Sequence, residues 1–129
     1  MEKLKILVVD DEEEIRQSLK NLLERRIKCE VRTAEDGNKA LELIQKEDFS
    51  LILLDIKMPG LSGTDVLKKV KVISPYISVI MITGYDSPQV VQEVFKEGAQ
   101  DYILKPLNVE VVYQKVKEVF DKRGEFSKS

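Results

Sequence analysis

The feature that most constrains the fold of this chain is a regular alternation of short apolar runs with longer segments of helical period. The runs, rich in aliphatic residues, cover residues 4–10, 29–34, 51–55, 78–83 and 101–104. Three of these runs are almost continuously apolar, which is typical of strands covered on both faces of a parallel sheet. The segments that follow the runs repeat apolar residues at spacings of three and four, which is typical of amphipathic helices. The pattern predicts five strand–helix units.

Five such units predict an α/β fold in which one parallel sheet has helices on both faces and right-handed crossovers. A chain of 129 residues can bury the core of one domain but not of two. The sequence contains no repeat of fixed period and no linker rich in Pro, Gly or Ser. We therefore expect a single domain over residues 1–122 and a flexible tail, or the start of a linker, over residues 123–129.

The charge balance argues against two classes of partner. Lys and Arg number 21 and Asp and Glu number 23, so the net charge is −2. No strong field points to direct nucleic-acid or membrane binding. The apolar runs are too short to span a bilayer, and an early acid interrupts the pattern that a signal peptide requires. We expect a cytoplasmic protein without a membrane segment.

Residue usage also limits the chemistry. The chain has no histidine and a single cysteine, Cys29, within a predicted strand. This composition excludes Ser-His-Asp and Cys-His catalysis, histidine-ligated zinc, an internal disulfide and a phosphohistidine of the chain's own. Any reaction must therefore use carboxylates, hydroxyls or lysine.

Polar residues stand at the carboxyl ends of four predicted strands. Asp10 and Asp11 close the first run, Asp55 closes the third, Thr83 closes the fourth and Lys105 follows the fifth. In open α/β sheets, ligands bind just beyond these strand ends, where the strand order reverses. The sequence therefore predicts that three carboxylates, a hydroxyl and an ammonium group converge on one crevice.

Some of these residues also have a simple structural explanation. Asp11 and Glu14 fit a capping box, Thr83 can end a strand, and Lys105 can be solvated. Asp10 and Asp55, which end apolar runs, are harder to explain in this way, because burial side by side opposes the ionisation of two carboxyl groups. A divalent cation would relieve that conflict.

Mg²⁺ fits such a cluster, since it binds one or two carboxylates together with water and phosphate oxygens. An aspartate beside Mg²⁺ is a nucleophile for phosphate, while a hydroxyl and an ammonium group can bind the phosphoryl oxygens. The cluster therefore predicts an aspartate that accepts a phosphoryl group.

Four ordered motifs, "VVDD", "LLDIKMPGLSG", "MITGY" and "GAQDYILKP", resemble the receiver domain of two-component response regulators along nearly the whole chain. Residues 81–106 are most similar to receivers of enhancer-binding (NtrC-type) transcription activators, and a stand-alone regulator is the alternative. The resemblance implies the flavodoxin-like (CheY-like) fold with strand order 2-1-3-4-5.

The resemblance implies that Asp55 accepts a phosphoryl group from a sensor histidine kinase. It implies Mg²⁺ as the cofactor, with Asp11 and Asp55 as direct ligands, Asp10 acting mainly through water, and the backbone carbonyl of Lys57 as a further ligand. The protein would not be a conventional enzyme. It would be a signalling phosphoprotein that catalyses its own phosphotransfer and its own slow dephosphorylation.

The resemblance also implies a switch. Thr83 would contact the phosphoryl group, Lys105 would pair with it, and Tyr102 would be the switch aromatic that rotates inward. Lys105–Pro106 matches a cis peptide of the family. The surface of the fourth helix, fifth strand and fifth helix would then contact an output domain or downstream protein, and we expect a phosphorylation-dependent homodimer through the last helices.

Two further side chains, Lys57 and Tyr85, are expected to flank the path of the hydrolytic water. By their bulk, and through a cation–π contact, they would slow dephosphorylation. Simple exposure of both side chains in loops is the alternative.

Other functions fit the sequence less well. A flavin mononucleotide site is disfavoured because "DDEEE" would repel the phosphate, and a dinucleotide site because no G-x-G-x-x-G follows a strand. A haloacid-dehalogenase-type phosphatase would need an aspartate where Lys57 stands. A non-phosphorylated pseudo-receiver that acts as a docking module stays the alternative. Such a module would be expected to lack Asp55 or the acidic pair, and this chain contains both.

Overall fold

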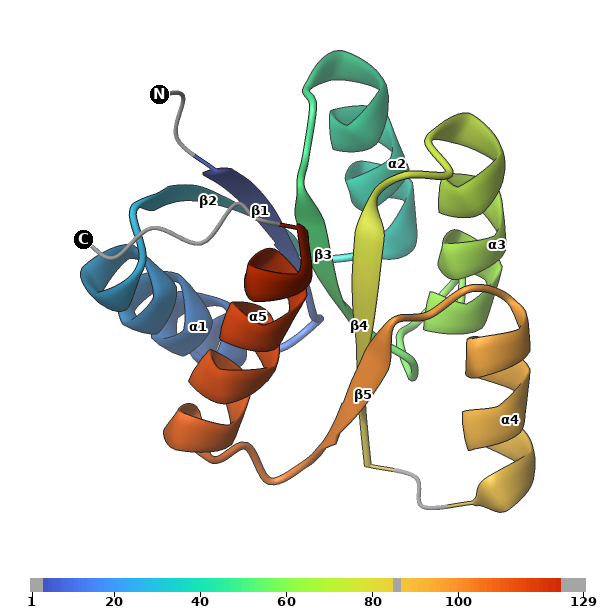
Figure 1. Ribbon diagram of the computed structural model, residues 1–129. Helices are drawn as coiled ribbons and strands as arrows, with labels where there is room; N and C mark the ends of the chain where they lie inside the picture. Colours follow the sequence, from blue (N-terminus) through green and yellow to red (C-terminus); the bar gives the residue numbers. More distant parts are fainter. Residues whose placement is uncertain (1–3, 85–86, 124–129) are drawn as a thin grey trace.

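Five parallel strands form one sheet in the order β2-β1-β3-β4-β5 in the computed structural model, which describes residues 4–84 and 87–123 (Figure 1). This order and the α/β class confirm the prediction. The strands are β1 Leu4–Val9, β2 Cys29–Ala34, β3 Leu51–Asp55, β4 Ser78–Thr83 and β5 Asp101–Leu104. β1 ends one residue earlier than predicted, although Asp10 N still donates to Ala34 O at 3.2 Å.

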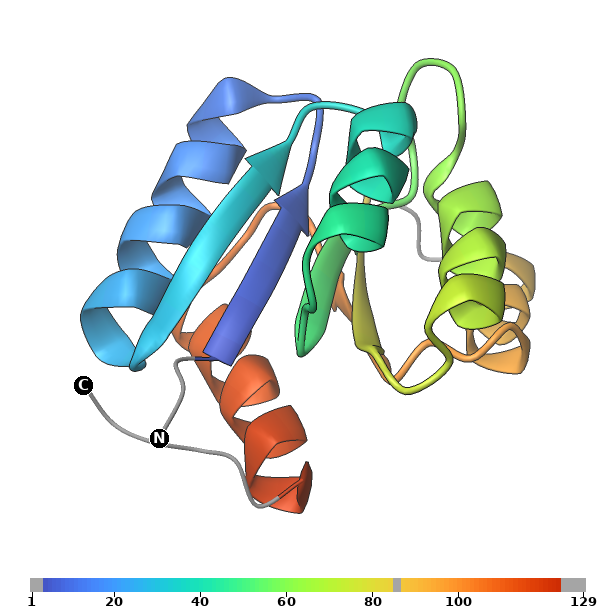
Figure 2. The ribbon, with the colours of Figure 1, turned by 90° about the horizontal axis from the view of Figure 1, so that it is seen from above.

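A helix follows each strand, and the helices cover both faces of the sheet (Figure 2). α1 and α5 lie on one face, and α2, α3 and α4 lie on the other. Their bounds are α1 Glu13–Arg26, α2 Gly37–Lys46, α3 Gly63–Ile73, α4 Pro88–Lys96 and α5 Val109–Arg123. No helix over the described residues combines the length and the apolar composition that crossing a bilayer requires.

Successive residues of the central strands enter two different cores, which explains why their sequences are almost continuously apolar. Leu53 packs in the core beneath α1 and α5, whereas Leu54 packs in the core beneath α2, α3 and α4. Both side chains are completely buried. Burial of a leucine contributes roughly 1.5–3 kcal/mol relative to exposure, so the two cores fix the register of β3. Asp55 is therefore held at the end of the strand.

The start of α1 differs from the predicted capping box. The residue at the N-cap is Glu12 rather than Asp11, and its side chain makes no cap hydrogen bond. Instead, Asp10 Oδ1 accepts a hydrogen bond from Glu12 N at 2.9 Å, and Arg16 Nη1 donates to Asp10 O at 2.8 Å. The buried aspartate therefore orders the turn between β1 and α1, and this role replaces the predicted cap.

The end of α5 contacts the edge of the sheet where β3 and β4 begin. Arg123, the first residue of the predicted tail, is the last residue of this helix. Its Nη1 atom donates to Ser50 O at 2.6 Å and to Ser78 Oγ at 3.3 Å, so it contacts the residue before β3 and the first residue of β4. Residues 124–129 lie outside the described residues, and the tail stays a prediction.

Candidate functional site

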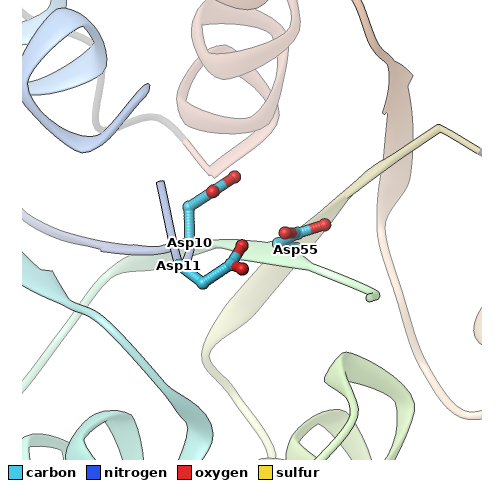
Figure 3. Close-up of side chains that lie close together, drawn as sticks. All are labelled: Asp10, Asp11 and Asp55. Atoms are coloured by element: carbon cyan, nitrogen blue, oxygen red, sulfur yellow. The ribbon is translucent and has the colours of Figure 1, made fainter. Parts of the chain in front are cut away.

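Three carboxylates gather where β1 and β3 end (Figure 3). Asp10 is completely buried, Asp55 is 2% exposed, and Asp11 is exposed. One carboxylate oxygen from each residue lies within 4.8 Å of the other two. β1 and β3 are adjacent parallel strands, so their carboxyl ends bring the acidic pair and Asp55 together.

Lys105 is the cation that faces the buried acids. Its backbone N–H donates to Thr83 O at 2.8 Å, which fixes the start of the β5–α5 loop beside β4. Its Nζ atom donates to Asp55 Oδ2 at 3.3 Å and lies 3.2 Å from Asp10 Oδ2. The Lys105–Pro106 peptide bond is cis, as the family resemblance implies. The four strand ends thus bring one ammonium group against two buried carboxylates.

The buried acids resist ionisation. Burial, reinforced by the nearby charge of Asp10, raises the pKa of Asp55 to about 6, and Lys105 opposes that shift. Burial also raises the pKa of Asp10, against the effect of a hydrogen bond from Glu12 N and of the Lys105 charge. Both shifts reflect the cost of placing a carboxylate where water is excluded. One lysine therefore does not fully compensate the two acids.

Lys105 responds in the complementary direction. Partial burial lowers the pKa of its ammonium group, but the charges of Asp55 and Asp10 outweigh burial and raise this pKa above its ordinary value. The lysine is therefore charged throughout the physiological pH range.

The loop after β3 packs tightly against the strand that carries Asp55. Gly63 N donates to Ile56 O at 2.7 Å, so the first residue of α3 is bonded to the residue after the aspartate. A Cβ atom on Gly63 would lie 2.1 Å from Asp55 O and 2.6 Å from Ile56 Cα. Only glycine allows this approach of two backbones. The helix start thereby holds the aspartate backbone in place.

Thr83 and Tyr102 lie on neighbouring strands. Thr83 ends β4 and is 1% exposed, while Tyr102 lies on β5 and is half-buried. The Tyr102 ring meets Phe95 of α4 edge to face, with ring centroids 5.9 Å apart and an interplanar angle of 80°. Phe95 is 42% exposed, so this aromatic pair lies at the surface of the domain.

A cavity of about 630 Å³ opens over the carboxylates. Its lining consists of Asp11, Glu12, Asp55, Lys57, Met58, Pro59, Gly84 and Lys105. Of the two residues predicted to flank a water path, Lys57 thus lines this cavity, and Tyr85 lies outside the described residues. The cavity gives a small molecule or a protein side chain access to Asp55.

The carboxylates also fit a metal ion. Asp10 Oδ2 is buried and accepts no hydrogen bond from the described residues, although Lys105 lies beside it. An incompletely satisfied buried oxygen beside two further carboxylates is a donor set suited to a hard cation with oxygen ligands. The acidic pocket of Asp10, Asp11 and Asp55 could therefore bind a metal ion.

Sequence reasoning missed one residue of the site, Glu12. Its Oε1 atom lies 3.5 Å from Lys105 Nζ, and its side chain is 60% exposed. One sequence signal was present, because glutamate is a poor residue for the N-cap position where Glu12 stands. It could be recognised only after the helix start had been located.

Comparisons with known proteins identify the family of this chain. The model of the response regulator receiver domain matches residues 6–117. Sporulation initiation phosphotransferase F of Bacillus subtilis (strain 168) is 36% identical over 114 residues, which cover 88% of this chain and 91% of that protein. Transcriptional regulatory protein ZraR of Klebsiella oxytoca is 39% identical over 107 residues, which cover 83% of this chain but only 24% of that protein.

A solved structure gives the same result. The crystal structure of a CheY-like response regulator receiver domain protein from Methanospirillum hungatei JF-1 matches with a TM-score of 0.90 and 36% identity. The match covers 95% of this chain and 98% of that one. In sequence and in strand order, this chain belongs to the receiver domains of two-component response regulators.

Proposed function

We propose that this receiver domain takes a phosphoryl group from the phosphohistidine of a sensor histidine kinase onto Asp55, with Mg²⁺ as cofactor. The observation that carries the proposal is the position of Asp55. Its buried carboxylate lies beside two further aspartates, within hydrogen-bond distance of Lys105, and it lines a cavity open to the surface. These 129 residues contain no histidine, so the phosphohistidine donor lies outside them.

In the proposed reaction, one carboxylate oxygen of Asp55 forms a bond to phosphorus as the phosphorus–nitrogen bond of phosphohistidine breaks. The electron pair of that bond leaves with the imidazole nitrogen. Lys105 donates to the phosphoryl oxygens and offsets the charge that develops on them. Its present contact with Asp55 Oδ2 already places the ammonium group beside the reacting carboxylate.

Asp10, Asp11 and Asp55 would hold the Mg²⁺, with the backbone carbonyl of Lys57 as a further ligand. The buried Oδ2 of Asp10 and the exposed carboxylate of Asp11 supply oxygen donors of the kind that Mg²⁺ prefers. When bound, Mg²⁺ supplies positive charge that balances the carboxylates and the phosphoryl oxygens. It would also keep Asp55 ionised, which a nucleophile requires.

Phosphorylation is proposed to shift the domain between two conformations. The Thr83 hydroxyl would bind a phosphoryl oxygen, and Tyr102 would then rotate inward. Phosphate favours the active state to the extent that it binds that state more strongly. The half-buried position of Tyr102 against Phe95 supports this role, because the ring has a defined partner to leave.

The face of α4, β5 and α5 is the proposed contact surface for an output domain or downstream protein. Phe95, Leu104 and Val111 are exposed apolar residues of these three elements, and β5 and α5 border a cavity of about 370 Å³. A phosphorylation-dependent homodimer through the last helices is proposed as well. A monomer in both states, measured by analytical ultracentrifugation, would count against the dimer.

Three further parts of the proposal concern the role of the domain in the cell. The protein would act in the cytoplasm as a signalling phosphoprotein that dephosphorylates itself slowly, without direct contact with nucleic acid. Its position at the cavity supports a role for Lys57 in slowing hydrolysis. Lys57→Ala should therefore dephosphorylate faster than the wild type, and the same result is proposed for Tyr85→Ala.

The first experiment measures intact mass after incubation with Mg²⁺ and acetyl phosphate. The wild type should gain one phosphoryl group, and the gain should require both Mg²⁺ and Asp55. Asp55→Asn is the test variant, and Asp48→Asn changes an exposed aspartate just before the same strand as a matched control. No adduct, together with no binding of beryllofluoride, would refute phosphorylation and favour a docking module.

A further inference from the structure

Glu12 adds a fourth carboxylate to the lining of the cavity over Asp55. Its side chain is 60% exposed, its Oε1 atom lies 3.5 Å from Lys105 Nζ, and it lines the cavity over Asp55. As the N-cap residue of α1 it makes no side-chain cap hydrogen bond. The carboxylate therefore contacts Lys105 rather than the N–H groups of its own helix.

This position matters for the charge that an incoming phosphodonor meets. Three aspartates would share a bound Mg²⁺, whereas Glu12 is a further carboxylate, 60% exposed, that lines the same cavity. Its compensating charge is Lys105, which also contacts Asp10 and Asp55. When Lys105 turns to a phosphoryl oxygen, the contact with Glu12 competes with that movement. The negative charge of Glu12 also remains in the path of an anionic donor.

We propose that Glu12 is a positioning and specificity-determining residue that disfavours small anionic phosphodonors by holding Lys105 and by repelling the donor at the cavity mouth. This inference rests on the proposed function of Asp55. A protein donor can place a cation opposite Glu12 as it docks, but acetyl phosphate carries only negative charge. Glu12 therefore favours transfer from a protein over transfer from a free metabolite.

The reaction that tests the proposal is phosphorylation by acetyl phosphate. An Asp55 carboxylate oxygen bonds to phosphorus as the bond between phosphorus and the acetate oxygen breaks, and acetate leaves with the electron pair. In Glu12→Gln the side chain keeps its size but loses its charge. At low ionic strength and saturating Mg²⁺, the second-order rate constant should rise about three- to tenfold, as expected for removal of one like charge a few ångströms from the donor.

The matched control is Glu13→Gln, which removes the same charge from the next residue, an exposed glutamate outside the cavity lining. It should react at close to the wild-type rate, and Glu12→Asp, which keeps the charge, should stay slow. Two further readouts separate charge from shape. The gain should shrink in about 1 M salt, where the Debye length is about 3 Å. It should also be smaller with phosphoramidate, which carries less negative charge than acetyl phosphate.

The outcomes distinguish this inference from the function on which it rests. If the wild type is phosphorylated on Asp55 but Glu12→Gln reacts no faster than Glu13→Gln, the role of Glu12 is refuted and the function stands. A gain that persists in high salt would overturn the electrostatic explanation. If neither acetyl phosphate nor beryllofluoride reacts with or binds to the wild type, both proposals fail together.

Discussion

Lys105 donates a hydrogen bond to Asp55 across the carboxyl end of the sheet, with 3.3 Å between Nζ and Oδ2. The two residues belong to the ends of β5 and β3, which are separated by β4. The same ammonium group lies 3.2 Å from the completely buried Asp10. In the absence of a metal ion, one cation thus serves two buried carboxylates. The folded domain holds excess negative charge at the place where a cation and a phosphoryl group would bind.

Replacement of Lys105 by glutamine should destabilise the metal-free protein. The substitution leaves two buried carboxylates without their cation, and the loss of one partner of a buried pair costs roughly 3–5 kcal/mol. Since the acids can partly protonate, we expect a fall of about 2–4 kcal/mol in the free energy of unfolding at pH 7. Urea titration with EDTA measures this value.

A matched control is Lys68→Gln, which changes an exposed lysine of α3. It should stay within about 0.5 kcal/mol of the wild type. Saturating Mg²⁺ should recover part of the stability lost in Lys105→Gln, because it binds the folded state. Equal stability of the two variants in EDTA would show that Lys105 does not neutralise the buried acids.

Replacement of Asp55 by asparagine should have the opposite effect on the metal-free protein, and the effect should depend on pH. The pKa of Asp55 is raised from 3.8 to about 6 in the folded state, so the folded protein binds this proton more tightly than the unfolded chain does. Protonated Asp55 therefore favours folding below the unfolded pKa, and this contribution is lost as the pH rises through about 6. Asparagine carries no such proton.

Relative to the wild type, Asp55→Asn should thus gain stability as the pH rises from about 4 to 6 and should keep that gain at higher pH. The rise in the pKa of Asp55 from 3.8 to about 6 corresponds to about 1–3 kcal/mol in the free energy of unfolding. Urea titrations in EDTA at several pH values test it. A gain that is constant across this pH range would show that the folded-state pKa of Asp55 is not raised.

Replacement of Asp11 by asparagine should weaken Mg²⁺ binding with little effect on the stability of the metal-free protein. Its carboxylate is exposed, so Asp11→Asn should change the metal-free unfolding free energy by no more than about 0.5 kcal/mol. The same variant loses an oxygen ligand with full charge, and Mg²⁺ should bind about ten- to a hundredfold more weakly. Isothermal titration calorimetry with Mg²⁺ measures the affinity. Unchanged affinity would remove Asp11 from the proposed ligand set.

The sequence allowed prediction of the sheet because each central strand is apolar on both faces. The register of Leu53 and Leu54 with their two cores, and hence the position of Asp55, depends on this pattern. The sequence did not predict the start of α1 correctly. The carboxylate that accepts a hydrogen bond from the turn before this helix belongs to Asp10, which is buried at the end of the preceding strand. The sequence also did not reveal that Glu12 contacts Lys105, which lies 93 positions later and is brought near only by tertiary packing.

Gly63 is a second feature that depends on packing, and it yields a prediction of its own. Gly63→Ala would bring a methyl group within 2.1 Å of Asp55 O, and neither backbone can move without disturbing β3. We expect a loss of at least about 2 kcal/mol, in the upper part of the usual range of about 1–3 kcal/mol for overpacking, because backbone atoms must shift. Gly84→Ala is the control, since a Cβ there meets no atom of the described residues within 4 Å. Similar stabilities in urea titration would contradict the close approach.

The contact between Phe95 and Tyr102 should oppose the proposed switch. The edge-to-face pair is present in this structure, and the proposed inward rotation of Tyr102 would break it. Such pairs contribute about 0.5–1.5 kcal/mol beyond their burial. Phe95→Leu keeps an apolar side chain but removes the ring, so it should shift the population toward the active state and tighten beryllofluoride binding about two- to tenfold.

The control for this change is Val72→Ala, which shortens an apolar side chain that is 83% exposed on α3. Its beryllofluoride affinity, measured with saturating Mg²⁺, should match that of the wild type. Stronger binding by Phe95→Leu alone would show that the aromatic pair stabilises the inactive state. Weaker binding would mean that Phe95 supports the active arrangement instead, and Tyr102 would then rotate without losing this partner.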